Sequence, residues 1–143
     1  MTFKTFTISA LIASSMMAAP AIAGSSIVIL DQFGWDNSAG VGQTGVHNRT
    51  RVYQEGWGNT TVSTQDGAFN RTSVGQSGFN NAADTEQNGF NNVSGIAQMG
   101  GFNDAEVYQD GDNNAIGVIQ IGNGNSTSTT QVGSGNVAVI IQD

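Results

Sequence analysis

The sequence contains no cysteine, one proline and one histidine, and only 10% of its 143 residues are charged. The lack of cysteine excludes a disulfide framework, the usual source of stability in small secreted proteins. Metal sites and acid–base catalysts need several titratable side chains at fixed spacing, and His47 has no such companions. We therefore expect no catalytic residue, no metal and no cofactor, and we do not expect an enzyme.

Basic residues are scarce in this sequence. Residues 1–23 have Lys4 near the start, an apolar stretch, and Ala21-Ile22-Ala23 at the end, which predicts a secretory signal peptide. Residues 24–143, the predicted single domain, hold three arginines against eleven acidic residues. This balance argues against nucleic acid as a partner. We expect a secreted protein.

What the chain does contain is a repeat of eleven residues. Every glutamine lies eleven residues from the next: Gln32, Gln43, Gln54, Gln65, Gln76, Gln87, Gln98, Gln109, Gln120, Gln131 and Gln142. Glycine follows two residues later: Gly34, Gly45, Gly56, Gly67, Gly78, Gly89, Gly100, Gly111, Gly122 and Gly133. Asparagine follows five residues after glutamine: Asn37, Asn48, Asn59, Asn70, Asn81, Asn92, Asn103, Asn114, Asn125 and Asn136.

The repeat predicts one β-strand and one turn in each unit. From asparagine to the next glutamine, the repeated asparagine, small, aliphatic and glutamine positions alternate with variable ones, so they share one side of a seven-residue strand. Glycine allows the backbone to turn. Asparagine, valine and threonine are poor helix formers, which argues against an eleven-residue helical coiled coil.

A flat antiparallel meander would have the same spacing, but its repeated side would face nothing. Two strands per turn would bury the repeated sides of two sheets against each other, with identical residues stacked every 22 residues. We predict an all-β, two-sheet parallel β-solenoid. Residues 26–32 fit the same register, which makes about eleven strands and places the first and the last in one sheet.

Buried amides are costly unless their donors and acceptors are used. Stacked glutamines and asparagines can bond to their own copies above and below, so the repeat serves as a template for stacking. The end strands, SIVILDQ and NVAVIIQ, are the most apolar in the chain and carry no proline or polar cap. We expect such a solenoid to polymerise.

The Gln-x-Gly-x-x-Asn pattern with glutamine at the eleventh place resembles the curlin repeat of bacterial curli subunits. The resemblance covers residues 26–143. It implies a structural subunit of an extracellular functional amyloid fibre of a Gram-negative bacterium, used in adhesion and biofilm matrix. The implied partners are further copies of the chain, a nucleator or major-subunit paralogue, and an outer-membrane secretion pore.

An alternative is a secreted solenoid that does not polymerise, either an adhesin or an ice-binding protein. The mixed outward residues argue against a flat ice-matching face. Four aromatic residues, Trp35, Trp57, Phe79 and Phe102, are expected to line one edge, where they either cover the turns by stacking or contact a surface. His47 is expected in an exposed turn. Asp110 and Asp112 are interpreted as surface charge rather than a calcium site.

Overall fold

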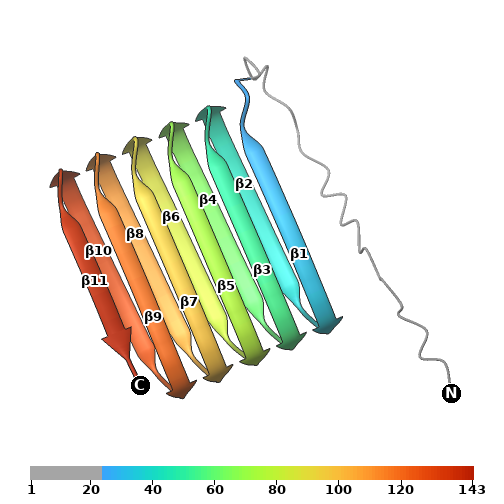
Figure 1. Ribbon diagram of the computed structural model, residues 1–143. Helices are drawn as coiled ribbons and strands as arrows, with labels where there is room; N and C mark the ends of the chain where they lie inside the picture. The colour runs from blue at the N-terminus through green and yellow to red at the C-terminus, as the bar shows by residue number, and fades with distance from the viewer. Residues whose placement is uncertain (1–23) are drawn as a thin grey trace, which may run out of the picture.

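The computed structural model describes residues 24–143, which form a flattened β-solenoid of eleven strands (Figure 1). The predicted signal peptide, residues 1–23, lies outside the described residues. Among those that are described, no helix has the length and hydropathy to cross a membrane. The strands are β1 (Ile27–Trp35), β2 (Ser38–Val46), β3 (Arg49–Trp57), β4 (Thr60–Ala68), β5 (Arg71–Phe79), β6 (Ala82–Phe90), β7 (Val93–Gly101), β8 (Asp104–Asp112), β9 (Ala115–Asn123), β10 (Ser126–Ser134) and β11 (Val137–Gln142).

The strands form two parallel sheets that stack the repeat on itself. The odd sheet has the order β1-β3-β5-β7-β9-β11, and the even sheet has the order β10-β8-β6-β4-β2. Paired residues are 22 apart in the sequence, so Gln32 lies beside Gln54 and Gly34 beside Gly56. The predicted fold class is confirmed. The first and last strands share the odd sheet, as the strand count predicted, so the last turn of the solenoid is half complete.

The core between the sheets is largely polar. Along β3 and β4 the burial alternates from residue to residue, which leaves asparagine, threonine, serine, valine and glutamine inside. An apolar column runs through the middle of the odd sheet, with Val52, Val74, Ile96 and Val118 all at most 3% exposed. Glutamines on either side of this column are equally buried, so their amides must be bonded inside the protein.

The strands are longer than the sequence predicted. Instead of seven residues ending at glutamine, the first ten strands have nine and continue through glycine to the residue after it. The parallel pairing continues because the glycine corner of one turn lies directly against the same corner of the next, as Gly34 and Trp35 do against Gly56 and Trp57. Only two residues, the second of them asparagine, remain outside each strand.

Two left-handed positions make each corner. The glycine column has φ between 97° and 123°, which requires glycine. The residue just before asparagine also has positive φ, a requirement that the sequence analysis missed. Eight of these ten residues are of types that favour this region. They are Asp36, His47, Gly58, Phe69, Asn80, Asn91, Phe102, Asn113, Gly124 and Gly135, and the two phenylalanines are the exceptions.

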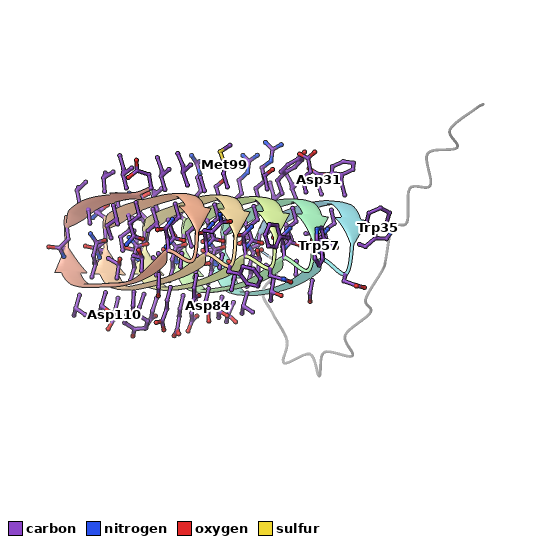
Figure 2. The ribbon with its side chains drawn as sticks, turned by 90° about the horizontal axis from the view of Figure 1, so that it is seen from below. Asp31, Trp35, Trp57, Asp84, Met99 and Asp110 are labelled. Atoms are coloured by element: carbon purple, nitrogen blue, oxygen red, sulfur yellow. The ribbon has the colours of Figure 1, made fainter. Side chains whose placement is uncertain are left out.

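The two outer faces of the solenoid differ in chemistry. Figure 2 shows Met99 on one face and Asp84 and Asp110 on the other. The odd-sheet face carries Arg49, Arg51 and Arg71 near its start and becomes apolar towards β11. The even-sheet face is acidic, with Asp66, Asp84, Glu86, Asp104, Glu106 and Asp110. Charged side chains are thus confined to the solvent side of the sheets and to the corners.

Candidate functional site

The glutamine side chains form two continuous hydrogen-bonded ladders through the solenoid. In each bond, Nε2 of one glutamine donates to Oε1 of the glutamine 22 residues later, over 2.6 to 3.0 Å. One ladder runs from Gln32 to Gln142 in the odd sheet, and the other runs from Gln43 to Gln131 in the even sheet. Every bond points the same way, so each ladder has a donor end and an acceptor end.

The ladders are also tied to the opposite sheet. The second proton of most glutamines reaches a main-chain carbonyl 16 residues earlier, as Gln76 does to Thr60 at 3.0 Å. Threonine bridges successive glutamines across the core: Gln65 Nε2 donates to Thr72 Oγ1, which donates to Gln87 Oε1. Thr50, Thr61 and Thr127 make the same bridge. The small position two residues after asparagine therefore ties each ladder to the opposite sheet.

Ser94 occupies this bridging position in β7 but does not make the bridge. Its Oγ is buried and has no partner within the described residues. The stacked threonine one turn earlier, Thr72, carries an additional methyl group and forms both bonds. Ala83 and Ala105 show that the position also accepts a residue without any hydroxyl. The bridge is thus an addition to the ladders and not a condition for them.

The asparagine column differs from the amide ladder that the sequence suggested. Asn70 Oδ1 accepts the main-chain N–H of Asn92, and Asn70 Nδ2 donates to the carbonyl of Gly89 at 2.9 Å. Direct asparagine-to-asparagine amide bonds occur only at some turns, such as Asn81 to Asn59. The reason is that this short side chain lies at the corner, where main-chain groups of the next turn are within reach. Asparagine therefore joins side chain to backbone between turns.

The glycine column completes the corner. A Cβ at any glycine from Gly34 to Gly111 in this column would overlap the carbonyl oxygen of the glycine one turn later. That carbonyl is the one that accepts the asparagine Nδ2, so glycine and asparagine act as a pair. Glycine is needed for its close approach as well as for its φ.

Aromatic residues line both edges, although the sequence analysis named only one. On the expected edge, Trp57 stacks on Phe79 at 5.5 Å between ring centroids, and Phe79 meets Phe102 edge-on at 5.2 Å. Trp35, at the start of this row, is 76% exposed.

The other edge carries His47, Phe69 and Phe90. His47 is exposed, and its ring lies parallel to that of Phe69 at 4.9 Å, while Phe69 meets Phe90 at 5.4 Å. The 22-residue spacing of His47 and Phe69 could have predicted this second row from the sequence.

The two ends of the solenoid leave complementary groups unused. At the C-terminal end, Gln131 and Gln142 donate to main-chain carbonyls and have no ladder acceptor among residues 24–143. At the N-terminal end, Oε1 of Gln32 and Gln43 accepts no bond within the same range. The inward side chains of β1 are uncovered as well, since Val28 is 49% and Leu30 41% exposed. Each end thus has an unsatisfied ladder and an open core.

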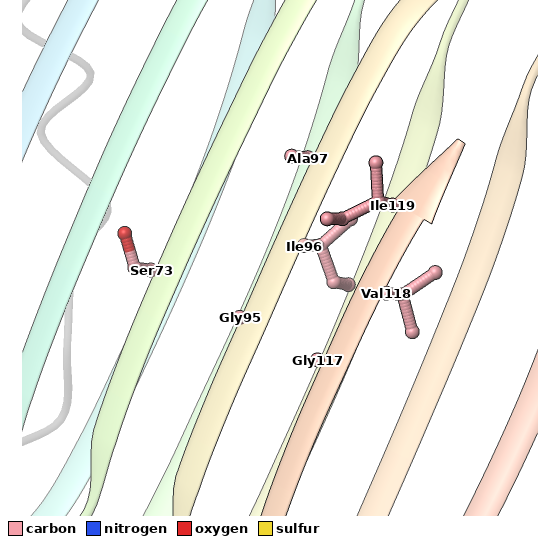
Figure 3. A pocket seen from close by; sticks show the side chains of 7 residues that line it. All are labelled: Ser73, Gly95, Ile96, Ala97, Gly117, Val118 and Ile119. Atoms are coloured by element: carbon pink, nitrogen blue, oxygen red, sulfur yellow. The ribbon is translucent and has the colours of Figure 1, made fainter. Parts of the chain in front are cut away.

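The hollows on the outer faces are shallow, and one of them is lined by Arg49, Arg51 and Arg71. A shallow groove on the odd-sheet face arises where Gly95 and Gly117 stack without side chains, and its lining includes no titratable group (Figure 3). On the even-sheet face, partial burial and the neighbouring Glu106 and Asp104 raise the pKa of Asp84. Within residues 24–143, no three histidine or acidic side chains are grouped to hold a metal ion.

Comparison with known proteins agrees with the geometry. Residues 102–131, from the corner before β8 to the glutamine of β10, match the curlin-associated repeat family. No curated protein matches the chain. The matched segment has the same columns of glutamine, glycine and asparagine as the other units of the solenoid, and the same ladder bonds pass through it. The match over residues 102–131 supports a curlin-family repeat protein.

Proposed function

We propose that the protein is a structural subunit of an extracellular, curli-like amyloid fibre, which grows by stacking the C-terminal end of one copy on the N-terminal end of the next. Its role is mechanical and not catalytic. The curlin repeat supports this assignment, and so does a fold in which every turn is a template for another turn.

The observation that carries the proposal is the polarity of the glutamine ladders. The C-terminal end presents Nε2 donors of Gln131 and Gln142, and the N-terminal end presents Oε1 acceptors of Gln32 and Gln43. Two C-terminal ends would place donors against donors. Head-to-tail stacking is the arrangement that continues the ladders, and it also covers apolar side chains that are exposed in a single copy.

The similarity to the curlin repeat supports a proposal for export and biological use. We propose secretion directed by the signal peptide at residues 1–23 and passage through an outer-membrane pore. Assembly would proceed with a nucleator or major-subunit paralogue. The fibre would serve adhesion and biofilm matrix. The exposed odd-sheet and even-sheet faces run along the sides of such a fibre, where they remain available to surfaces and to other fibres.

Incubation of purified residues 24–143 at micromolar concentration tests the proposal. We expect a lag followed by dye-binding fibres with the cross-β repeat of about 4.8 Å along the fibre axis. Preformed fibres should abolish the lag. A chain that stays monomeric with the folded circular dichroism spectrum would contradict the proposal and favour an adhesin that does not polymerise.

A pair of neighbouring substitutions shows whether growth uses the ends. In β11, Ile140 points into the core between the two sheets, whereas Ile141 points outward and is 68% exposed. Ile140→Lys places a charge where the next copy must pack, so this variant should add to a fibre by its N-terminal end and then block it. We expect small amounts to stop wild-type growth. Ile141→Lys should elongate normally, and equal behaviour of the two variants would exclude growth through this end.

A further inference from the structure

The odd number of strands leaves a vacant strand position at the C-terminal end. Strand β11 completes the odd sheet, but the even sheet stops at β10, so β11 is covered from across the core only on the side of β10. In Figure 1, β11 is the outermost strand at this end. Ala138 and Ile140 of β11 are consequently only partly buried. The neighbouring edge of β10 has no partner strand within residues 24–143.

We propose that a second copy of this chain fills the vacancy with its β1, so that successive subunits of the fibre are related by half a revolution about the fibre axis. Strand β1 of the next copy pairs with β10, and β2 of the next copy pairs with β11. The odd sheet of one copy then continues as the even sheet of the next. This inference rests on the proposed fibre function and specifies its subunit interface.

The glutamine ladders continue without a break across this interface. Gln131 Nε2 donates to Gln32 Oε1 of the next copy, and Gln142 Nε2 donates to Gln43 Oε1 of the next copy. The arrangement also completes Gln32. Nine of the other ten glutamines, all but Gln109, donate to a main-chain carbonyl 16 residues earlier, whereas Gln32 bonds only to Gln54 within the described residues. In the half-turn arrangement, the equivalent acceptor is the carbonyl of Val137 in the preceding copy.

The asparagine column and the core are completed in the same way. Asn136 Oδ1 accepts no bond within residues 24–143, whereas Asn114 Oδ1 accepts the main-chain N–H of Asn136. The main-chain N–H of Asn37 from the next copy takes the equivalent place on Asn136. In the core, Leu30 of the next copy lies across from Ile140, because residues two places before glutamine occupy the middle of both sheets. The exposed apolar surface of each is thereby removed from water.

Pure translation of the subunit is the competing arrangement. It would place β1 of the next copy on β11 within the odd sheet, and it would bring Ile29 of that copy beside Val139. This pair of β-branched residues is favourable. However, translation pairs one free strand edge and leaves a gap between β10 and the β2 of the next copy. The half-turn arrangement pairs both edges and closes both ladders, so it uses more main-chain hydrogen bonds.

The half-turn arrangement makes a distinct prediction for the shape of the fibre. Five and a half turns at about 4.8 Å each give a subunit rise of about 26 Å, against about 29 Å for a translated subunit that leaves the vacancy empty. It also alternates the two faces, so each side of the fibre shows the arginine-bearing and the acidic face in turn. A translated fibre would show one face along each side.

Paired cysteines distinguish the two arrangements, because the chain has none of its own. In the half-turn fibre, residue 29 of the next copy lies beside residue 128, about 4.8 Å away between Cα atoms, which suits a disulfide. In the translated fibre, residue 29 lies beside residue 139. The test variants are Ile29→Cys with Ser128→Cys, and Ile29→Cys with Val139→Cys. Within one copy, both pairs are too far apart to bond, because they join strands at opposite ends of the solenoid.

We expect oxidation of fibres of the 29/128 variant to give a ladder of covalent oligomers on a denaturing gel, and fibres of the 29/139 variant to stay monomeric. A ladder from the 29/139 variant, from both variants or from neither would overturn the half-turn arrangement. The helical symmetry of fibres of the unsubstituted chain is an independent measurement. A rise near 26 Å with a rotation near half a revolution is expected, and a rise near 29 Å without it would overturn the inference. If no fibres form, the proposed function itself fails.

Discussion

Removal of one central glutamine should destabilise the solenoid far more than removal of an outward side chain. Gln76 in β5 accepts from Gln54 and Thr61 and donates to Gln98 and to the carbonyl of Thr60, all between 2.8 and 3.0 Å. In Gln76→Ala, Gln98 Oε1 is left without a donor, and three further partners each lose one bond. At ~1–3 kcal/mol for a buried group left unpaired, the total is about 2–5 kcal/mol.

The concentration of unfolded chain in equilibrium with fibres measures this loss, because every bond of Gln76 lies within one copy. At about 1.4 kcal/mol for each factor of ten, the concentration should rise about 30-fold or more. Gln76→Met, which keeps the length of the side chain but not the amide, should retain most of the effect and so separate hydrogen bonding from cavity formation. Thr60→Ala, on the outer face, should change stability by less than about 0.5 kcal/mol. Equal effects of Gln76→Ala and Thr60→Ala would refute the reasoning.

The remaining predictions concern glycine, charge and a buried hydroxyl. Gly78→Ala should prevent fibre growth, because Gly78 has φ of 123° and no room for a Cβ. Gly75→Ala in the same strand should grow normally, because a Cβ at Gly75 would meet no atom within 4 Å. Seeded growth rates compare the two variants. Asp84 has a raised pKa because it is partly buried and lies beside Glu106, so its ionised form opposes folding above that pKa. Fibre growth should therefore accelerate as the pH falls through the pKa of Asp84. The double variant Asp84→Asn with Glu106→Gln should lose most of this acceleration, and lag times measured across a range of pH test this. Ser94→Ala removes a buried hydroxyl without a partner, so the guanidinium midpoint of the fibres should stay equal or rise, and a clear fall would contradict the unpaired assignment.

Sequence reasoning predicted most of the fold because the repeat has no insertions. Eleven glutamines at one spacing determine the strand period, the 22-residue stacking and the odd strand count, and these define both sheets. It was less successful at the corners. The positive φ of the residue before asparagine is hidden by Phe69 and Phe102, whose residue type does not suggest it. The backbone contacts of asparagine depend on how closely two corners approach, which spacing alone does not give.

The sequence by itself determined which side chains stack on their own copies. Residues repeat every eleven positions and strand side chains alternate between the two sides, so only the repeated asparagine, small, aliphatic and glutamine positions can all face inward. Only the tertiary structure decided how those side chains bond. The threonine bridges between Gln65, Thr72 and Gln87 require the facing sheet to be offset by half a turn. The common direction of all glutamine bonds is likewise a property of the assembled ladder, because an isolated amide has no preferred end. That direction gives the solenoid one donor end and one acceptor end.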